Sequence, residues 1–285
     1  MVTGDRMSGL QSVPLAVEVD AEHGGRWTSL HGGGREWLWR REDPRRALVV
    51  PRDAFVDAGG LEECVPTVRG VPDHGDAWSR GWSPLTDGDA VLEHVVRCPD
   101  FVLTRRIEVL DGVVVADYRL AAEPGFRFLW AGHALLDLSG QAALEADQGT
   151  ETRVFSAGAD WVAGAWPAPA GVRLDELGPD DGSAVGAVLV SPEDTAAVAV
   201  RDGADRLHLS VRAPGQPTGV ALWRNLGGFP TGAPYRSIGV EPMLGRVFDL
   251  AHAGDGDCAV TPASGEVRWQ LTISAFRAKE GTQTP

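Results

Sequence analysis

The segment FRFLWAGHALLDL, residues 126–138, is apolar on both faces when it is read as a β-strand. Alternate residues of a strand point to opposite faces. Large apolar side chains occupy one face: Phe126, Phe128, Trp130, Ala134 and Leu136. The other face is also apolar apart from one histidine: Leu129, Ala131, His133 and Leu135. A strand that is buried on both sides predicts a layered structure, such as a large sandwich whose concave sheet is itself covered by loops.

Short apolar and β-branched runs recur along the chain, among them AVLEHVVR, FVLTRRIEVL and RLHLSVRA. Turn dipeptides such as Asp111-Gly112 and Asp202-Gly203 separate them, as in β-hairpins. The 36 glycines and 19 prolines also disfavour helices. We predict an all-β fold that forms a single domain. Residues 160–183, rich in Gly, Pro and Asp, are predicted to form a long loop.

We place the domain at residues 15–277, after a poorly ordered N-terminal extension (1–14) and before a C-terminal tail (278–285). The N-terminus lacks an apolar run behind a basic start, so we expect no signal peptide. No apolar stretch approaches the ~18 residues of a membrane span. The three cysteines, Cys64, Cys98 and Cys258, are far apart, and we expect buried free thiols. These features favour a cytoplasmic protein.

The formal net charge is -14. A nucleic-acid partner needs a basic surface, and an acidic protein is repelled by anionic lipid. We therefore expect a small-molecule ligand, neither nucleic acid nor a membrane. The sequence leaves monomer and dimer equally open.

Two ionisable residues lie in apolar strands. His133 is either a core histidine or, if it faces a cavity, a general acid or base. Glu241, in YRSIGVEPMLG (residues 235–245), is either a solvent-facing residue at a strand end or a buried carboxylate with a raised pKa. The preceding glycine-rich loop has Trp223 and Tyr235 near its ends, and is suited to lining a pocket.

The segment VPDHGDAWSRGW, residues 71–82, combines ionisable and aromatic side chains. Arg80 can give paired hydrogen bonds to a ligand, and Trp78 can stack on a sugar or fill the core. Just upstream, either Glu62 or Glu63 is a candidate for the same site, and we select Glu63. Asp73, His74 and Asp76 are metal ligands by type, but no second cluster has ligand spacing, so we predict no metal.

The order of these segments resembles that of the aldose 1-epimerase, or galactose mutarotase-like, superfamily. The resemblance rests on EHGGRWTSLHGGGREWLW (22–39), GGLEECVPTVRGVPDHGDAWSRGW (59–82), FLWAGHALLDL (128–138) and YRSIGVEPMLG. It covers most of the chain, from about residue 15 to 276.

The resemblance implies a β-supersandwich with a sugar-binding cleft on its concave face and no cofactor. Glu241 matches the general base that acts on the anomeric hydroxyl, and His133 matches the general acid at the ring oxygen. His74 matches the first histidine, which helps to hold the sugar, and Arg80 resembles the arginine that follows it in the hexose-phosphate branch, so we expect both to bind the substrate. The surroundings of His133 differ from those of true galactose mutarotases, so the resemblance leaves the sugar open.

The expected function is interconversion of the α and β anomers of a monosaccharide or sugar derivative. One alternative is a hexose-6-phosphate 1-epimerase in which Arg26, Arg40, Arg41, Arg80 and Arg224 supply a phosphate clamp. Others are a non-catalytic carbohydrate-binding protein on the same fold, or a lyase or isomerase acting on a sugar-like metabolite.

Overall fold

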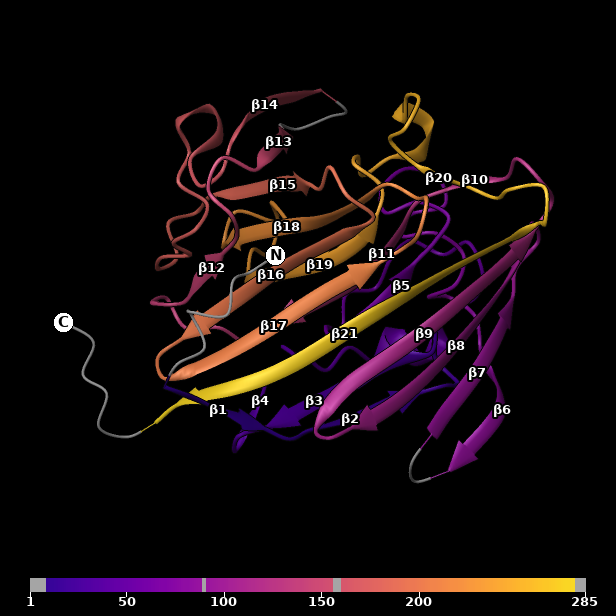
Figure 1. Cartoon of the computed structure of the whole chain (residues 1–285), viewed down its shortest axis with the longest axis horizontal. Helices are drawn as coiled ribbons and strands as arrows, with labels where there is room; N and C mark the ends of the chain where they lie inside the picture. Colours follow the sequence, from indigo (N-terminus) through magenta and orange to yellow (C-terminus); the bar gives the residue numbers. More distant parts are fainter. Residues whose placement is uncertain (1–8, 89–90, 156–159, 280–285) are drawn as a thin grey trace.

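The computed structural model describes residues 9–88, 91–155 and 160–279. Within them the chain forms two large, mainly antiparallel sheets and short 3-10 helices (Figure 1). The nine-stranded sheet contains β1 (Leu10–Val13), β6 (Ser83–Gly88), β7 (Val91–Arg97), β8 (Phe101–Leu110), β9 (Val113–Ala122), β12 (Ala143–Glu145), β16 (Thr195–Asp202), β17 (Asp205–Arg212) and β21 (Glu266–Ala278). Its strand order is β12-β16-β17-β21-β9-β8-β7-β6, with β1 paired to β21.

The ten-stranded sheet contains β2 (Leu15–Asp20), β3 (Arg26–Gly32), β4 (Arg35–Glu36), β5 (Leu61–Cys64), β11 (Trp130–Leu136), β13 (Glu151–Phe155), β14 (Trp161–Ala165), β15 (Ala184–Val190), β18 (Thr218–Leu226) and β19 (Arg236–Leu244). Its order is β14-β13-β15-β18-β19-β11-β5-β3-β2, with β4 paired to β3. The remaining elements are the short pair β10 (Arg127–Phe128) and β20 (Ala259–Val260), and the 3-10 helices η2 (Pro44–Leu48), η3 (Pro169–Gly171) and η4 (Leu250–His252). The all-β prediction is confirmed.

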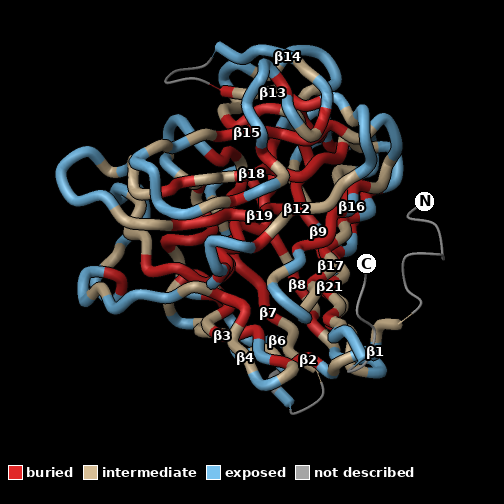
Figure 2. The backbone as a smooth tube through the Cα atoms, turned by 90° about the vertical axis from the view of Figure 1, so that its left-hand side faces the viewer, coloured by how far each residue is buried: buried red, intermediate tan, exposed pale blue. Residues whose placement is uncertain are grey.

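The main core lies between the two sheets, and exposed loops surround it (Figure 2). In β8, buried and half-buried residues alternate from Phe101 to Glu108, as expected when one face of a strand packs on a core. In β11, by contrast, every residue is buried. Trp130 and Leu136 join the core between the sheets, whereas Ala131 belongs to a second apolar cluster on the outer face of the ten-stranded sheet. The predicted burial of this segment on both faces is therefore confirmed.

Both predicted hairpin turns lie between antiparallel strands. Asp111 and Gly112, with φ of 51° and 81°, join β8 to β9. Gly203, with φ of 62°, lies in the turn from β16 to β17. A positive φ is a conformation that glycine and aspartate adopt more readily than other residues.

Two segments differ from the prediction. Leu10–Val13, assigned to a poorly ordered extension, form β1 and pair with Ala275–Ala278 of β21. The predicted long loop at 160–183 begins with β14, which pairs with β13. Both strands are short and lie at sheet edges or ends, where the apolar alternation is weakest. The remainder of the predicted N-terminal extension up to residue 8, and most of the C-terminal tail, 280–285, lie outside the described residues.

Candidate active site

His133 and Glu241 face each other on the outer side of the ten-stranded sheet. The β11–β19 register pairs Ala131 with Met243 and Leu135 with Gly239, which sets His133 opposite Glu241. Directly opposed residues in an antiparallel pair point to the same face. Nε2 of His133 accordingly lies 3.7 Å from Oε1 of Glu241. Two strands that are remote in sequence thus bring an imidazole and a carboxylate into contact.

Both side chains are nearly inaccessible: Glu241 is 2% exposed and His133 8%. Burial raises the pKa of Glu241, and the facing His133 opposes this shift. Burial also lowers the pKa of His133, while Glu241 opposes that shift. Within the described residues, Nδ1 of His133 and Oε2 of Glu241 have no hydrogen-bond partner. The pair therefore keeps a free nitrogen and a free carboxylate oxygen to offer to a polar ligand.

An aromatic cluster adjoins the pair. The Phe55 ring stacks on His74, with centroids 3.6 Å apart and planes 9° from parallel. It meets His133 edge-on at 5.8 Å and Trp78 edge-on at 4.9 Å. The rings of His74 and His133 lie 5.1 Å apart. The 71–82 loop thus brings His74 to the histidine of β11, and the sugar-binding role of His74 stays a prediction.

A tight turn places His74. Its φ is 58°, and the next residue, Gly75, has φ of 79° and packs so closely on the Val65 backbone that a Cβ would overlap it. Nδ1 of His74 lies 2.9 Å from Oδ1 of Asp73. Because a neutral imidazole has one donor and one acceptor nitrogen, this contact with a carboxylate favours a proton on Nδ1.

Glu62 and Glu63 point to opposite sides of the sheet. Glu62 pairs with His133 in the β5–β11 register and shares its face. Arg46 Nε and Nη2 each donate to the Glu62 carboxylate at 3.1 Å. Burial raises the pKa of Glu62 to about 7, although the charges of Arg46 and Arg26 oppose the shift.

Glu63 lies in the core between the sheets. Its carboxylate accepts hydrogen bonds from Arg105 Nη1 at 2.7 Å, Tyr118 OH at 2.9 Å and Trp130 Nε1 at 2.7 Å. These donors explain its complete burial. The structure therefore corrects the choice between the two carboxylates, because Glu62 and not Glu63 lies on the candidate site's side of the sheet.

Two aromatic residues come from the predicted glycine-rich loop and its flanks. Trp223 lies opposite Gly239 in the β18–β19 register, and its Cβ, like the Glu241 carboxylate, borders the space where a Gly239 side chain would be. Tyr235 stacks on Trp39 with ring centroids 5.5 Å apart, and its hydroxyl donates to Asp57. Trp223 thus lies on the same face of the sheet as Glu241.

The other two predicted binding residues have different surroundings. Trp78 is 1% exposed, and its indole N–H donates to the Asp73 carbonyl at 3.0 Å, so it packs as a core residue. Nη2 of Arg80 lies 3.6 Å from the Asp76 carboxylate, and the arginine also interacts with Cys98 beside the nine-stranded sheet. The structure thus does not bring Arg80 to the His133–Glu241 pair.

Sequence reasoning missed Phe55, Asp57 and Arg46. All three come from the irregular segment between Trp39 and Leu61, where neither strand alternation nor a family motif identified them. The available signal was a phenylalanine, the single aromatic residue between Trp39 and Leu61.

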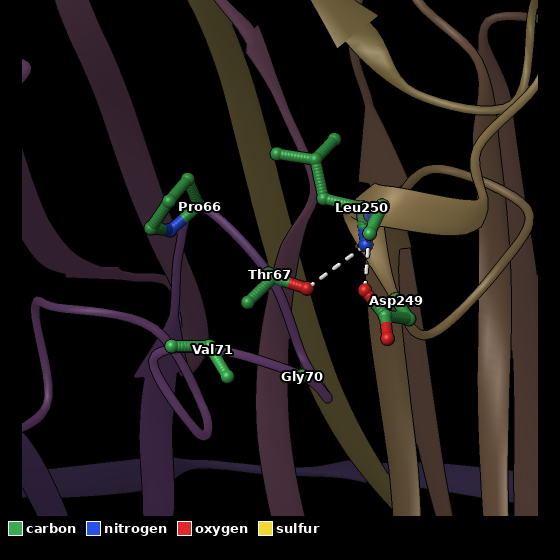
Figure 3. Close-up of a pocket in the computed structure, with 7 residues that line it drawn as sticks. Pro66, Thr67, Gly70, Val71, Asp249 and Leu250 are labelled. Atoms are coloured by element: carbon green, nitrogen blue, oxygen red, sulfur yellow. Dashed lines mark hydrogen bonds between the residues drawn. The ribbon is translucent and has the colours of Figure 1, made fainter. Parts of the chain in front are cut away.

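A hollow of about 400 Å³ lies elsewhere, between two turns (Figure 3). It is lined by Pro66, Thr67, Gly70, Val71, Asp249, Leu250 and Ala251. The Thr67 hydroxyl accepts a hydrogen bond from the Leu250 N–H at 3.0 Å, so this polar group is already satisfied. None of these residues is one of the predicted site residues.

Comparison with solved structures settles the fold. A galactose mutarotase related enzyme from Lactobacillus acidophilus matches with a TM-score of 0.65 and 13% identity, covering 95% of this chain and 97% of its own. A galactose mutarotase-like protein from Lactobacillus casei matches with a TM-score of 0.64 and 13% identity, covering 94% and 100%. The chain has the mutarotase-like fold. An Escherichia coli K12 protein provisionally assigned as an aldose 1-epimerase gives a TM-score of 0.66 at 13% identity, covering 94% and 99%.

Comparison by sequence finds no relative of this chain. No protein-family model matches it, and no curated protein matches it. No helix among its described residues is long and apolar enough to cross a membrane. Within those same residues, no group of three His, Cys, Asp or Glu side chains is placed to hold a metal ion.

Proposed function

We propose that this protein is an aldose 1-epimerase-like isomerase that interconverts the α and β anomers of a monosaccharide. One observation carries the proposal: a buried imidazole and a buried carboxylate, 3.7 Å apart, on the outer face of the ten-stranded sheet of a mutarotase-like fold. Fold alone does not specify function, so the argument rests on what these two groups can do.

Opening a sugar ring requires one proton to leave the C1 hydroxyl and one to reach the ring oxygen. Glu241 accepts the first and His133 donates the second. The ring opens to an aldehyde, rotation about C1–C2 presents the other carbonyl face, and reclosure reverses both transfers. Each positioned group of this kind contributes roughly 10²–10⁴-fold.

The electrostatics of the pair suit this exchange. Ring opening converts imidazolium and carboxylate into neutral imidazole and carboxylic acid, so the total charge of the pair does not change. Burial raises the pKa of Glu241 and lowers that of His133, which stabilises the neutral form relative to the ion pair. The two forms thereby approach each other in energy, as reversible transfer through a substrate requires.

The arginines favour an unphosphorylated sugar over a hexose 6-phosphate. Nη1 of Arg26 donates to the carbonyls of Ala58 and Gly59. Arg40 pairs with Glu36, Arg80 with Asp76, and Arg224 Nη1 donates to the Ser183 hydroxyl. Arg41 lies over the Tyr235 ring. These five groups serve separate local contacts instead of converging on one phosphate position. A tenfold or greater preference for the 6-phosphate would contradict this assignment.

A non-catalytic sugar-binding protein is the second candidate. It is favoured by the direct contact between His133 and Glu241, which leaves no space between them for a sugar, and by the Phe55 ring beside them. Such a protein needs Trp223 to bind the sugar but does not need the carboxylate of Glu241.

Saturation-transfer NMR between sugar anomers tests both candidates. The panel contains glucose, galactose, their 6-phosphates and an acidic sugar. Exchange faster than in buffer, and lost in Glu241→Gln and His133→Asn, supports the isomerase. Binding shifts without accelerated exchange establish the binding protein instead.

A further inference from the structure

An irregular loop covers the His133–Glu241 pair. We call residues 47–57 the covering loop; they run from the end of η2 towards the Gly59–Gly60 turn before β5. Residues 47–54 are exposed or half-buried, and Leu48 and Val50 are 76% and 56% exposed. Phe55 is also half-buried, and its ring turns inward onto His74, His133 and Trp78.

The position of Phe55 limits access to the pair. A ring at 3.6 Å from His74 and 5.8 Å from His133 excludes a sugar from the same side of these imidazoles. Glu241 and His133 are at the same time almost completely buried. A monosaccharide therefore reaches the side of the His133 ring that faces Phe55 only after the Phe55 ring has moved.

The end of the covering loop next to η2 is held firmly. Arg46, which is 5% exposed, bonds to the Glu62 carboxylate and donates to the carbonyls of His23 and Trp78 at 2.9 and 3.0 Å. Its guanidinium also lies 5.2 Å from the centre of the Trp78 ring. Separating a buried, multiply bonded ion pair is costly.

The other end is held by the Phe55 N–H, which donates to the Asp73 carboxylate, and by two hydrogen bonds of Asp57. Asp57 Oδ1 accepts the Gly59 N–H at 3.0 Å just beyond the loop, and Oδ2 accepts a hydrogen bond from the Tyr235 hydroxyl. Asp57 and Tyr235 are both half-buried. The Tyr235–Asp57 hydrogen bond is thus the contact that ties the Phe55 end of the loop to the β18–β19 connection, and water can replace it.

We propose that the covering loop opens to admit the ligand, and that the Tyr235–Asp57 hydrogen bond holds Phe55 over His133 in the closed state. That the ligand is a sugar rests on the proposed function, whereas the opening itself does not. Loss of this bond increases the fraction of open molecules and exposes the His133 ring.

Chemical modification of His133 measures the opening directly. The full-length protein is treated with diethyl pyrocarbonate, and the modification rate of each histidine is read by peptide mass spectrometry. Asp57→Asn and Tyr235→Phe should each increase the His133 rate by roughly tenfold or more, as expected for loss of a hydrogen bond to a carboxylate. Phe55→Ala, which removes the ring, should do the same.

The chain supplies matched controls. Asp53→Asn changes a carboxylate of the same loop that bonds only to the Val50 N–H, so it should leave the His133 rate unchanged. His252, with 55% of its side chain exposed, reports reagent activity. His94 lies in β7 of the other sheet and is 2% exposed, so its modification reveals general unfolding. If Asp57→Asn unfolds, Tyr235→Phe still carries the test.

An unchanged His133 rate in folded Tyr235→Phe, Asp57→Asn and Phe55→Ala overturns the proposal. Anomer exchange measured on the same samples separates it from the proposed function. A faster modification of His133 without any anomer exchange supports the opening of the loop and contradicts the proposed isomerase activity. Anomer exchange with unchanged rates of His133 modification supports the isomerase activity and contradicts the opening of the loop.

Discussion

Nε2 of His133 lies 3.7 Å from Oε1 of Glu241, across two neighbouring strands that are more than a hundred residues apart in sequence. Strand pairing alone fixes this contact, because the register of β11 against β19 sets the two residues opposite each other. The proposed chemistry depends on that register, and the following predictions test it.

Glu241→Gln is expected to lower the anomer exchange rate by roughly 10²-fold or more, because the amide cannot accept the C1 proton. The fold should remain, since Oε2 of Glu241 has no hydrogen-bond partner in the described structure and the replacing amide has nearly the same size without a charge to bury. Exchange NMR measures the loss of activity, and thermal unfolding checks that the fold is retained. Glu176→Gln, on a side chain that is 74% exposed, is the control. Full exchange in Glu241→Gln would remove this residue from the mechanism.

Gly239→Ala is expected to reduce exchange without unfolding the protein. A Cβ at residue 239 would overlap Oε1 of Glu241, so the carboxylate must turn away from His133. We expect kcat to fall at least roughly tenfold, given the strict geometry of proton transfer. Gly232→Ala is the matched control, because nothing lies within 4 Å of its Cβ position. Equal activity of the two variants would mean that Glu241 tolerates displacement.

Activity should persist in mildly acidic solution. The reaction uses one proton that Glu241 and His133 share. When both groups are protonated, Glu241 cannot act as a base and the reaction stops. Burial lowers the pKa of His133 below its ordinary value of 6.5, so uptake of the second proton requires a lower pH than for an exposed histidine. The acid limb of the kcat/KM profile, with buffer catalysis subtracted, should therefore have its midpoint below pH 6.5. A midpoint above that value contradicts the assignment.

Trp223→Ala is expected to raise KM about 3- to 10-fold with a smaller effect on kcat, as loss of one aromatic contact to a sugar would do. Trp223 shares the site face with Glu241, whereas Trp161 lies on the edge strand β14 and is 39% exposed. Trp161→Ala should therefore leave KM unchanged. Steady-state exchange measurements over a range of sugar concentrations distinguish the two.

Glu63→Gln is expected to destabilise the protein by about 3–5 kcal/mol, because Arg105 is left as a buried charge without its carboxylate. Arg105 and Glu63 are both fully buried, and their nearest atoms are 2.7 Å apart. Urea unfolding measures the loss, again with Glu176→Gln for comparison. A change below about 1 kcal/mol, the usual contribution of an exposed pair, would show that Arg105 finds other partners.

The sequence alone determined the layered all-β architecture, because the spacing of apolar residues indicates whether one or both faces of a strand are buried, as in β8 and β11. It also suggested His74, His133 and Glu241 as site residues, since ionisable groups in apolar strands and the order of motifs along the chain are visible without coordinates; their roles stay predictions. The short strands β1 and β14 were missed because pairing with a neighbour, and not their own composition, stabilises them.

Tertiary structure decided the choice between Glu62 and Glu63, because a change of one residue in register exchanges the two faces of a strand. It also decided that Trp78 packs in the core, that Arg80 interacts with Asp76, and that Phe55 and Asp57 adjoin the site. These roles depend on contacts between segments far apart in the chain, and no local pattern records which distant partner a side chain meets. The sequence therefore specified the two strands, and their pairing placed His133 against Glu241.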